Sequence, residues 1–273
     1  MGAHCEHVRA AFPHYAPPEF WAWYPGEGDL PEHDARCPTA QHPYARKHRA
    51  FFEAEAFTQQ QVRGLRKGYL ACISFVDHQL GRLVDAIAEA GLSATTNVAY
   101  ASDHGEMLGK FGMWWKCCLY EDAARVPMIA AGPDCAGGRR VATPVDLHDL
   151  RASLFAATGA TQPSDWLGTP LQGMPSDDPQ RVVFSEYHGH AAPGSAYLIR
   201  KGDWKYVHYV DAPCQLFDLK TDPQELEDLA PTHPDKVHEL LGELHAICSP
   251  EREHERAESF INRQLDHVAT TGT

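Results

Sequence analysis

One long helix, an apolar strand and a glycine-containing turn follow one another between residues 58 and 105, and this order constrains the fold more than any other feature. Thr58, with Gln61 three residues later, forms a capping-box pattern at a helix start. Apolar residues then recur at helical spacing as far as Gly91: Val62, Leu65, Tyr69, Ile73, Val76, Leu80, Leu83 and Ile87. The apolar stretch 97–102 predicts a buried strand, which runs directly into Asp103-His104-Gly105.

A second apolar strand and a second helix follow this unit. Residues 125–132 predict another buried strand, and residues 146–158 a helix that ends at Gly159. Helices that alternate with apolar strands imply an α/β sheet covered by helices on both faces. Residues 1–57 are rich in proline, histidine and aromatic side chains without sustained periodicity, so we expect irregular segments there.

The second half of the chain has a different texture. Short aromatic and β-branched runs predict a small antiparallel sheet, with Lys201-Gly202-Asp203 as a hairpin turn: 182–187, 196–200, 204–209 and 215–219. A helix is expected near 234–248. We therefore expect an α/β domain over residues 1–175, a small antiparallel β plus helix subdomain over 176–248, and a charged tail over 249–273.

Composition and charge exclude several classes of protein. The chain of 273 residues is 43% hydrophobic and 22% charged, as in an ordinary globular protein. Its formal net charge of −13 argues against nucleic acid as a partner, because that binding depends on lysine and arginine. No apolar run approaches the roughly 20 residues of a membrane span, so we expect no membrane partner. The eight cysteines have no Cys-x-x-Cys spacing and are expected to be ordinary thiols.

Asp103 and His104 follow a predicted strand directly, and in α/β sheets ligands bind beyond the ends of strands. A carboxylate and an imidazole side by side can ligate a divalent cation, and Gly105 lets the backbone turn away. Oxygen-rich surroundings would favour calcium, with magnesium or manganese as alternatives. Lys116 near such a cation would suit an anion such as sulfate or phosphate. These residues alone leave an alternative open. Asp103-His104-Gly105 would be a capped turn with a structural histidine, and Lys116 would be a surface lysine.

The whole stretch 102–127 resembles the second conserved segment of the sulfatases, a branch of the alkaline phosphatase superfamily. Its matching elements are, in order, Asp-His-Gly-Glu-x-x-Gly, Lys116, Leu119-Tyr120-Glu121 and Arg125-Val126-Pro127. The resemblance covers residues 12–232 and is nearest to the choline-sulfatase-like and arylsulfatase-like group.

This resemblance implies a fold, a reaction and roles for particular residues. The fold is an α/β sulfatase/alkaline-phosphatase-like sheet covered by helices, with amino-terminal strands missing and a small antiparallel carboxyl-terminal subdomain. The reaction is metal-dependent hydrolysis of a small sulfated substrate, a sulfate ester. Asp103 and His104 would bind the divalent metal, usually calcium, and Lys116 would contact the sulfate oxygens as a catalytic and substrate-binding residue. Glu121 and Arg125 are expected to form a buried structural ion pair.

The family's nucleophile, a formylglycine, comes from a Cys/Ser-x-Pro-Ser/Ala-Arg motif, and this chain has no site for it. The family's catalytic histidine aligns with Ala11, which leaves His14 as the nearest candidate. His188, after the predicted strand 182–187, is a candidate substrate-binding residue. We therefore expect the carboxyl-terminal half of a sulfatase, with little or no turnover by itself. Its partner would be a missing amino-terminal half or, in a homo-oligomer, a second copy.

Two other functions stay open on the sequence. A phosphodiester or phosphonate-ester hydrolase of the same superfamily would use the same metal and lysine on a phosphorylated substrate. A non-catalytic pseudoenzyme or subunit would bind an anion or a partner without turnover. The start Met1-Gly-Ala-His-Cys-Glu has no signal-peptide pattern, which favours the cytoplasm if Met1 is the true start.

Overall fold

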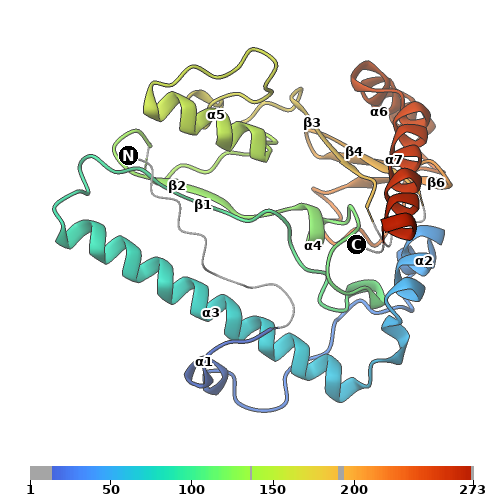
Figure 1. The fold of residues 1–273 in the computed structure, drawn as a ribbon, viewed down its shortest axis with the longest axis horizontal. Coiled ribbons are helices and arrows are strands. Elements are labelled where there is room, and N and C mark those ends of the chain that lie inside the picture. Colours follow the sequence, from blue (N-terminus) through green and yellow to red (C-terminus); the bar gives the residue numbers. More distant parts are fainter. Residues whose placement is uncertain (1–13, 136, 190–193, 272–273) are drawn as a thin grey trace.

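The computed structural model describes residues 14–135, 137–189 and 194–271. Its helices surround two separate sheets (Figure 1). The helices are α1 (Pro18–Ala22), α2 (Pro43–Phe51), α3 (Gln59–Glu89), α4 (Glu121–Ala124), α5 (Leu147–Thr158), α6 (Pro234–Ile247) and α7 (Pro250–Thr271). The strands are β1 (Val98–Ala101), β2 (Met128–Ala131), β3 (Val182–Tyr187), β4 (Ala196–Lys201), β5 (Trp204–Tyr209) and β6 (Ala212–Asp218).

The two helices that the sequence delimits most sharply begin and end as predicted. Thr58 and Gln61 form the capping box of α3, each side chain accepting a hydrogen bond from the other residue's amide. Asp146 caps α5 in the same way, and Gly159 ends it with φ 69°, in the left-handed region. Local capping chemistry therefore sets these boundaries.

Helix α2 and the short helix α1 lie in the segment for which we expected irregular structure, so that prediction is wrong. Tyr44, Ala45, His48 and Arg49 are the buried residues of α2. Two of these four are polar, so an apolar periodicity cannot be seen in the sequence. Tertiary hydrogen bonds from the polar pair compensate for their burial.

The first sheet contains only β1 and β2 among the described residues. The strands are antiparallel, with Val98 opposite Ala131 and Ala101 opposite Met128. In Figure 1 they lie between α3 and α5. None of their residues is buried, so the prediction of two buried strands is right in position and wrong in burial. The described residues supply no third strand that would cover this sheet.

The second sheet is the antiparallel one predicted for the second half of the chain. Its strand order is β3-β4-β5-β6, and Lys201 pairs with Trp204 across the Gly202-Asp203 turn. Helix α6 packs on it through Leu240 and Leu244, which are fully buried. The opposite side of the sheet belongs to a larger core that also contains residues of α2 and of the loop 107–120. The α/β class with a small antiparallel sheet is thus confirmed, whereas the domain boundaries stay a prediction.

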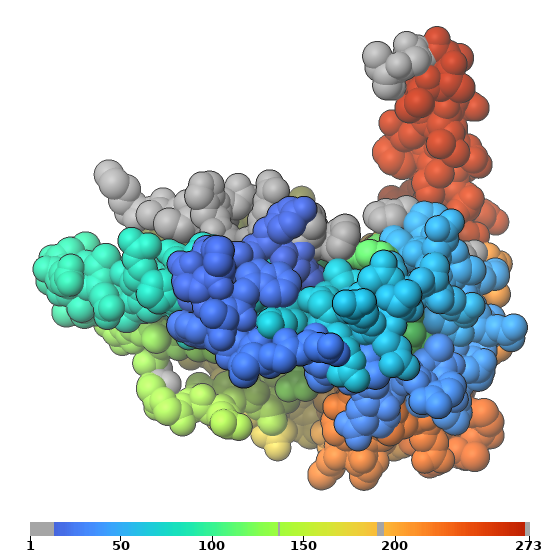
Figure 2. All heavy atoms as spheres, turned by 90° about the horizontal axis from the view of Figure 1, so that it is seen from below, coloured from blue at the N-terminus to red at the C-terminus, as the bar shows by residue number. Residues whose placement is uncertain are grey.

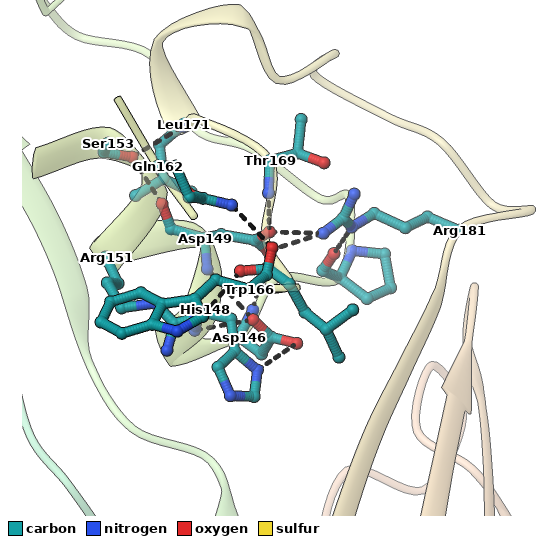
Figure 3. Close-up of polar contacts among 12 residues, drawn as sticks. Asp146, His148, Asp149, Arg151, Ser153, Gln162, Trp166, Thr169, Leu171 and Arg181 are labelled. Carbon is teal, nitrogen blue, oxygen red and sulfur yellow. Dashed lines mark hydrogen bonds and ion pairs between the residues drawn. The ribbon is translucent and has the colours of Figure 1, made fainter. Parts of the chain in front are cut away.

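A network around Asp149 ties the segment before β3 to α5 (Figure 3). The Asp149 carboxylate is fully buried and accepts hydrogen bonds from Arg181 at 2.6 and 2.7 Å. It also accepts from the backbone amides of Thr169 and Asp146. This saturated carboxylate has a structural role.

A buried ion triad joins α4 to the second sheet and corrects a prediction. Lys205 on β5 is fully buried, with Nζ 2.7 Å from Glu225 and 3.0 Å from Glu121. Burial alone would lower the pKa of Lys205, but the two carboxylates outweigh it and raise that pKa. Glu121 is thus paired with Lys205 in the structure, not with Arg125 as the sequence suggested.

The charged tail forms helix α7, which stands clear of the rest of the molecule in Figure 2. Its side chains Phe260, Leu265 and Val268 are each more than half exposed, at 55%, 61% and 51%. None of the described helices has the length and hydropathy that crossing a bilayer requires.

Candidate active site

Asp103 and His104 lie directly beyond the end of β1, as predicted. Gly105 follows them because the chain passes very close to α4 there: a Cβ at Gly105 would lie 2.0 Å from the carbonyl oxygen of Asp122. The amides of Gly105 and Glu106 donate to the carbonyls of Ala123 and Asp122. The backbone bends at Asp103, and a glycine at position 105 then lets it pass this close to α4.

Lys116, in the loop 107–120, has its side chain beside His104 and Asp103. Its Nζ lies 2.9 Å from Nε2 of His104, and Oδ2 of Asp103 lies 3.7 Å from the same ring nitrogen. The other ring nitrogen, Nδ1, lies 2.8 Å from the carbonyl oxygen of Gly105. A carbonyl only accepts, so Nδ1 carries the proton and Nε2 accepts from the Lys116 ammonium. The structure thus brings together all three residues that the motif suggested.

The loop that carries Lys116 is strained. Six non-glycine residues of the described chain have positive φ, and four of them lie here: Leu108, Phe111, Trp115 and Cys117. Trp115 and Cys117 flank Lys116, at φ 62° and 69°. Such conformations cost about 1–3 kcal/mol each and persist only where surrounding contacts enforce them.

Glu106, whose role is not apparent from the sequence, is one of the residues that hold the loop in this conformation. Its Oε1 accepts from the amide of Trp115 at 2.6 Å and from that of Leu108 at 3.2 Å. Burial raises the pKa of Glu106, although these amides and the positive charge of Lys116 oppose the shift. Its place within Asp-His-Gly-Glu was the only sequence signal for it.

Helix α2 holds the same loop from the other side. His48 donates from Nε2 to the carbonyl of Lys116 at 2.7 Å, and Tyr44 donates from its hydroxyl to the carbonyl of Cys117 at 2.9 Å. The two side chains lie one helical turn apart on the buried face of α2, so both reach the loop. Neither was predicted, because these contacts join residues about 70 positions apart in the sequence.

Asp103 and His104 fit one part of a divalent-cation site. The Asp103 side chain is 84% exposed and the His104 side chain 29%, so both can be reached. The Gly105 carbonyl accepts a hydrogen bond from Nδ1 and so fixes the orientation of the imidazole, as carbonyls commonly do for metal-binding histidines. Among the described residues no group of three His, Cys, Asp or Glu side chains could hold a metal ion, so water, substrate or other residues would supply further ligands.

His14 lies against α3. Its Nδ1 is 3.0 Å from the carbonyl oxygen of Leu65, and its ring meets that of Tyr69 edge-on at 5.4 Å. Burial lowers the pKa of His14, and the Leu65 carbonyl opposes the shift. The contacts described for His14 are therefore those of a packed histidine, and its catalytic role stays a prediction.

His188 follows β3 and takes part in a separate cluster. Its Nδ1 lies 2.7 Å from Oγ of Ser195, and its Nε2 lies 3.1 Å from Glu186. Oγ of Ser195 also lies 3.0 Å from Nδ1 of His254 on α7, so this cluster links β3, β4 and α7. A role for His188 in substrate binding stays a prediction.

One near match to the nucleophile motif is Cys248-Ser249-Pro250-Glu251-Arg252, which departs from it at Glu251. Cys248 ends α6 and packs against the core beneath that helix, whereas the Lys116 loop packs in the other core. Burial raises the pKa of the Cys248 thiol, which makes it less nucleophilic.

Comparisons with known proteins point to a single family. The model described as Sulfatase matches residues 30–160, and the model described as N-sulphoglucosamine sulphohydrolase, C-terminal, matches residues 109–250. Arylsulfatase K of Xenopus laevis is 34% identical over 206 residues, which are 70% of this chain and 38% of that protein. Choline-sulfatase of Rhizobium meliloti (strain 1021) is 34% identical over 228 residues, 80% of this chain and 44% of that protein.

The fold of this chain is similar to that of a solved structure. The phosphonate monoester hydrolase SpPMH of Silicibacter pomeroyi superposes with a TM-score of 0.70 at 25% identity, over 86% of this chain and 53% of that one. The chain thus spans about half or less of the length of the relatives it matches. The match to the second family model covers more than half of the chain, and Asp103, His104 and Lys116 lie within the match to the Sulfatase model. The chain therefore belongs to the sulfatase family, of which it contains the carboxyl-terminal portion.

Proposed function

We propose that this chain carries the metal-binding and anion-binding side of a sulfuric ester hydrolase. The observation that supports this most directly is the convergence of Lys116, His104 and Asp103, with Nζ of Lys116 2.9 Å from the His104 ring. The strained loop and its contacts to α2 hold the lysine backbone in place before any ligand arrives. Such preorganisation is what electrostatic stabilisation of a developing anion requires.

Each residue would have a distinct task. Asp103 and His104 would hold a divalent cation, calcium in the first instance, which would supply Lewis-acid stabilisation to the anion. The ring nitrogen Nε2 has one lone pair, so it can serve either a cation or the Lys116 ammonium. When the cation is bound, Lys116 is free to donate to the oxygens of a sulfate ester. His48 and Tyr44 keep the Lys116 backbone in position.

The substrate proposed is a small sulfated molecule, since a choline-sulfatase and arylsulfatases are among the relatives. The chain has no Cys/Ser-x-Pro-Ser/Ala-Arg motif from which the formylglycine nucleophile could be made. We therefore expect ligand binding by this chain but little or no turnover without a second polypeptide. Release of sulfate from 4-nitrophenyl sulfate by the purified chain with calcium would contradict this part of the proposal.

Titration calorimetry with sodium sulfate tests the site itself, in buffers with and without calcium chloride. Lys116→Met should weaken sulfate binding by about tenfold or more, because a charge-assisted hydrogen bond contributes roughly 1.5–3 kcal/mol. Lys220→Met is the matched control, since Lys220 is 75% exposed and lies outside this site. Asp103→Asn should remove the effect of calcium. Equal sulfate affinity in the Lys116 and Lys220 variants would refute the proposed role of Lys116.

A phosphonate-ester hydrolase is the second candidate, favoured by the likeness to SpPMH. The same lysine and cation would bind a phosphonate monoester, whose anion has a similar tetrahedral shape. Competition between phenyl sulfate and monophenyl phenylphosphonate for the calcium-loaded chain separates the two. Tighter binding of the phosphonate ester would transfer the proposal to that substrate class.

A further inference from the structure

The exposure of the sheet of β1 and β2 does not match the apolar sequence of its strands. The two strands read Val-Ala-Tyr-Ala and Met-Ile-Ala-Ala, every residue apolar, yet none is buried and Ile129 is 61% exposed. Strands that are apolar throughout are normally covered on both faces. In the second sheet, by contrast, β4 has four consecutive buried residues, Ala196 to Ile199. β1 and β2 therefore have the composition of central strands of a covered sheet, but they are as exposed as strands at the edge of a sheet.

The helices beside this sheet have uncovered apolar side chains as well. On α3, Leu83 is 41% exposed and Val84 48%; on α5, Leu147 is 40% exposed and Leu154 56%. No residue of α3 beyond Cys72 is buried, although its apolar spacing continues to Ile87. A two-stranded sheet is at best marginally stable in water without further strands or a helix packed on it. These elements together form an unfinished α/β layer.

The relatives indicate what completes the layer. This chain matches 38% of the Xenopus arylsulfatase K and 44% of the Rhizobium choline-sulfatase, in each case the carboxyl-terminal portion. A protein of the same fold therefore has at least as much chain again, from which more strands can come. We propose that β1, β2 and the exposed apolar sides of α3 and α5 are a docking surface for a polypeptide that carries the amino-terminal half of a sulfatase fold.

The docking surface is continuous with the candidate active site. β1 leads directly into Asp103 and His104, so strands added parallel to β1 would end at the same edge of the sheet as these residues. Loops at those strand ends are where α/β proteins place further site residues. Docking would thus bring the partner's groups to Lys116 and cover the apolar strands in one event. The docking itself rests on family membership and not on the proposed reaction.

Co-purification tests this proposal with a defined probe. The probe is the part of the Rhizobium choline-sulfatase that precedes the segment matched by this chain, co-expressed with the untagged chain and carrying an affinity tag. The chain should co-purify with it in a one-to-one complex. Hydrogen exchange at Val98–Ala101 and Met128–Ala131 should slow by about tenfold or more in that complex, whether or not the complex hydrolyses a sulfate ester.

Two variants identify the surface. Ile129→Glu places a charge on the exposed sheet and should abolish co-purification. Phe260→Glu changes a similarly exposed apolar residue on α7, 55% against 61% for Ile129, and should leave co-purification intact. Circular dichroism checks that both variants fold like the parent chain. Failure of the parent chain to co-purify, equal loss in both variants, or an Ile129-dependent association of the chain with itself alone would each overturn the proposal. A complex without turnover would leave docking established and contradict only the proposed function.

Discussion

Lys116 shows how a single residue is positioned by parts of the chain that are distant in sequence. The backbone around it is held by Glu106 within the loop and by His48 and Tyr44 from α2. Its two neighbours, Trp115 and Cys117, have positive φ, so the loop would relax without those contacts. His48 is the most informative of them because it can change its charge within an accessible pH range.

Acidification should destabilise the protein in part through His48. The side chain is fully buried, and burial lowers its pKa below the ordinary 6.5. The unfolded chain then takes up a proton first as the pH falls, so the stability contribution is present above pH 6.5 and is lost below it. His48→Gln should therefore flatten the fall in melting temperature between about pH 7 and pH 5.

The matched control is His238→Gln, because His238 is exposed on α6. It should reproduce the pH dependence of the parent chain. Other histidines, among them the half-buried His42 and His208, also have pKa values that burial lowers, so some acid sensitivity should remain in every variant. An unchanged pH dependence in His48→Gln would show that this imidazole is not the group that titrates.

At the scale of elements, side chains buried between helices and strands decide how the parts are joined. The triad of Lys205, Glu121 and Glu225 connects β5 to α4 and to the turn after β6. Burial raises the pKa of Glu225, whereas the pKa of Glu121 is lowered because Lys205 outweighs the effect of burial. Removing the central cation would leave two carboxylates facing each other in the core.

Lys205→Met should cost about 3–5 kcal/mol in the free energy of unfolding, the usual cost of leaving a buried charge unpaired. Urea denaturation measures it. Lys220→Met should change the stability little, since its contact with Asp203 at 3.9 Å is solvent-exposed on both sides. Adding Glu225→Gln to Lys205→Met should recover part of the loss. A Lys205 variant as stable as the Lys220 variant would contradict a stabilising role for the triad.

At the scale of the whole molecule, the two sheets differ in how well they are covered. The second sheet has a core on both faces, one beneath α6 and one shared with α2 and the Lys116 loop. The sheet of β1 and β2 has no buried residue. The well-covered second sheet therefore supports the Lys116 loop, whereas the sheet that leads into Asp103 has no buried residue.

Hydrogen exchange of the chain alone should show this difference. Amides in Val98–Ala101 should exchange at least about tenfold faster than those in β4 and β5, because opening an uncovered sheet exposes little apolar surface. Mass spectrometry of peptic fragments resolves the two regions. Equal protection of both sheets would mean that β1 and β2 are stabilised in a way that their exposure does not account for.

Much of the local structure could be predicted. The capping boxes of α3 and α5, the glycine that ends α5 and the four strands of the second sheet depend on neighbouring residues, and the structure has them where the sequence indicates. Asp103, His104 and Lys116 also come together as the motif suggested. Helix α2 could not be predicted, because half of its buried face is polar and is explained only by what it contacts.

The sequence by itself determined the family, the helix ends and the candidate metal and anion ligands, because these depend on residue type at short spacing. Only the tertiary structure decided that Glu121 pairs with Lys205 and that His48 and Glu106 support Lys116. It also decided that β1 and β2 are uncovered. Burial and ion pairing depend on which distant segments meet, and an apolar strand reads the same whether or not its neighbours are present.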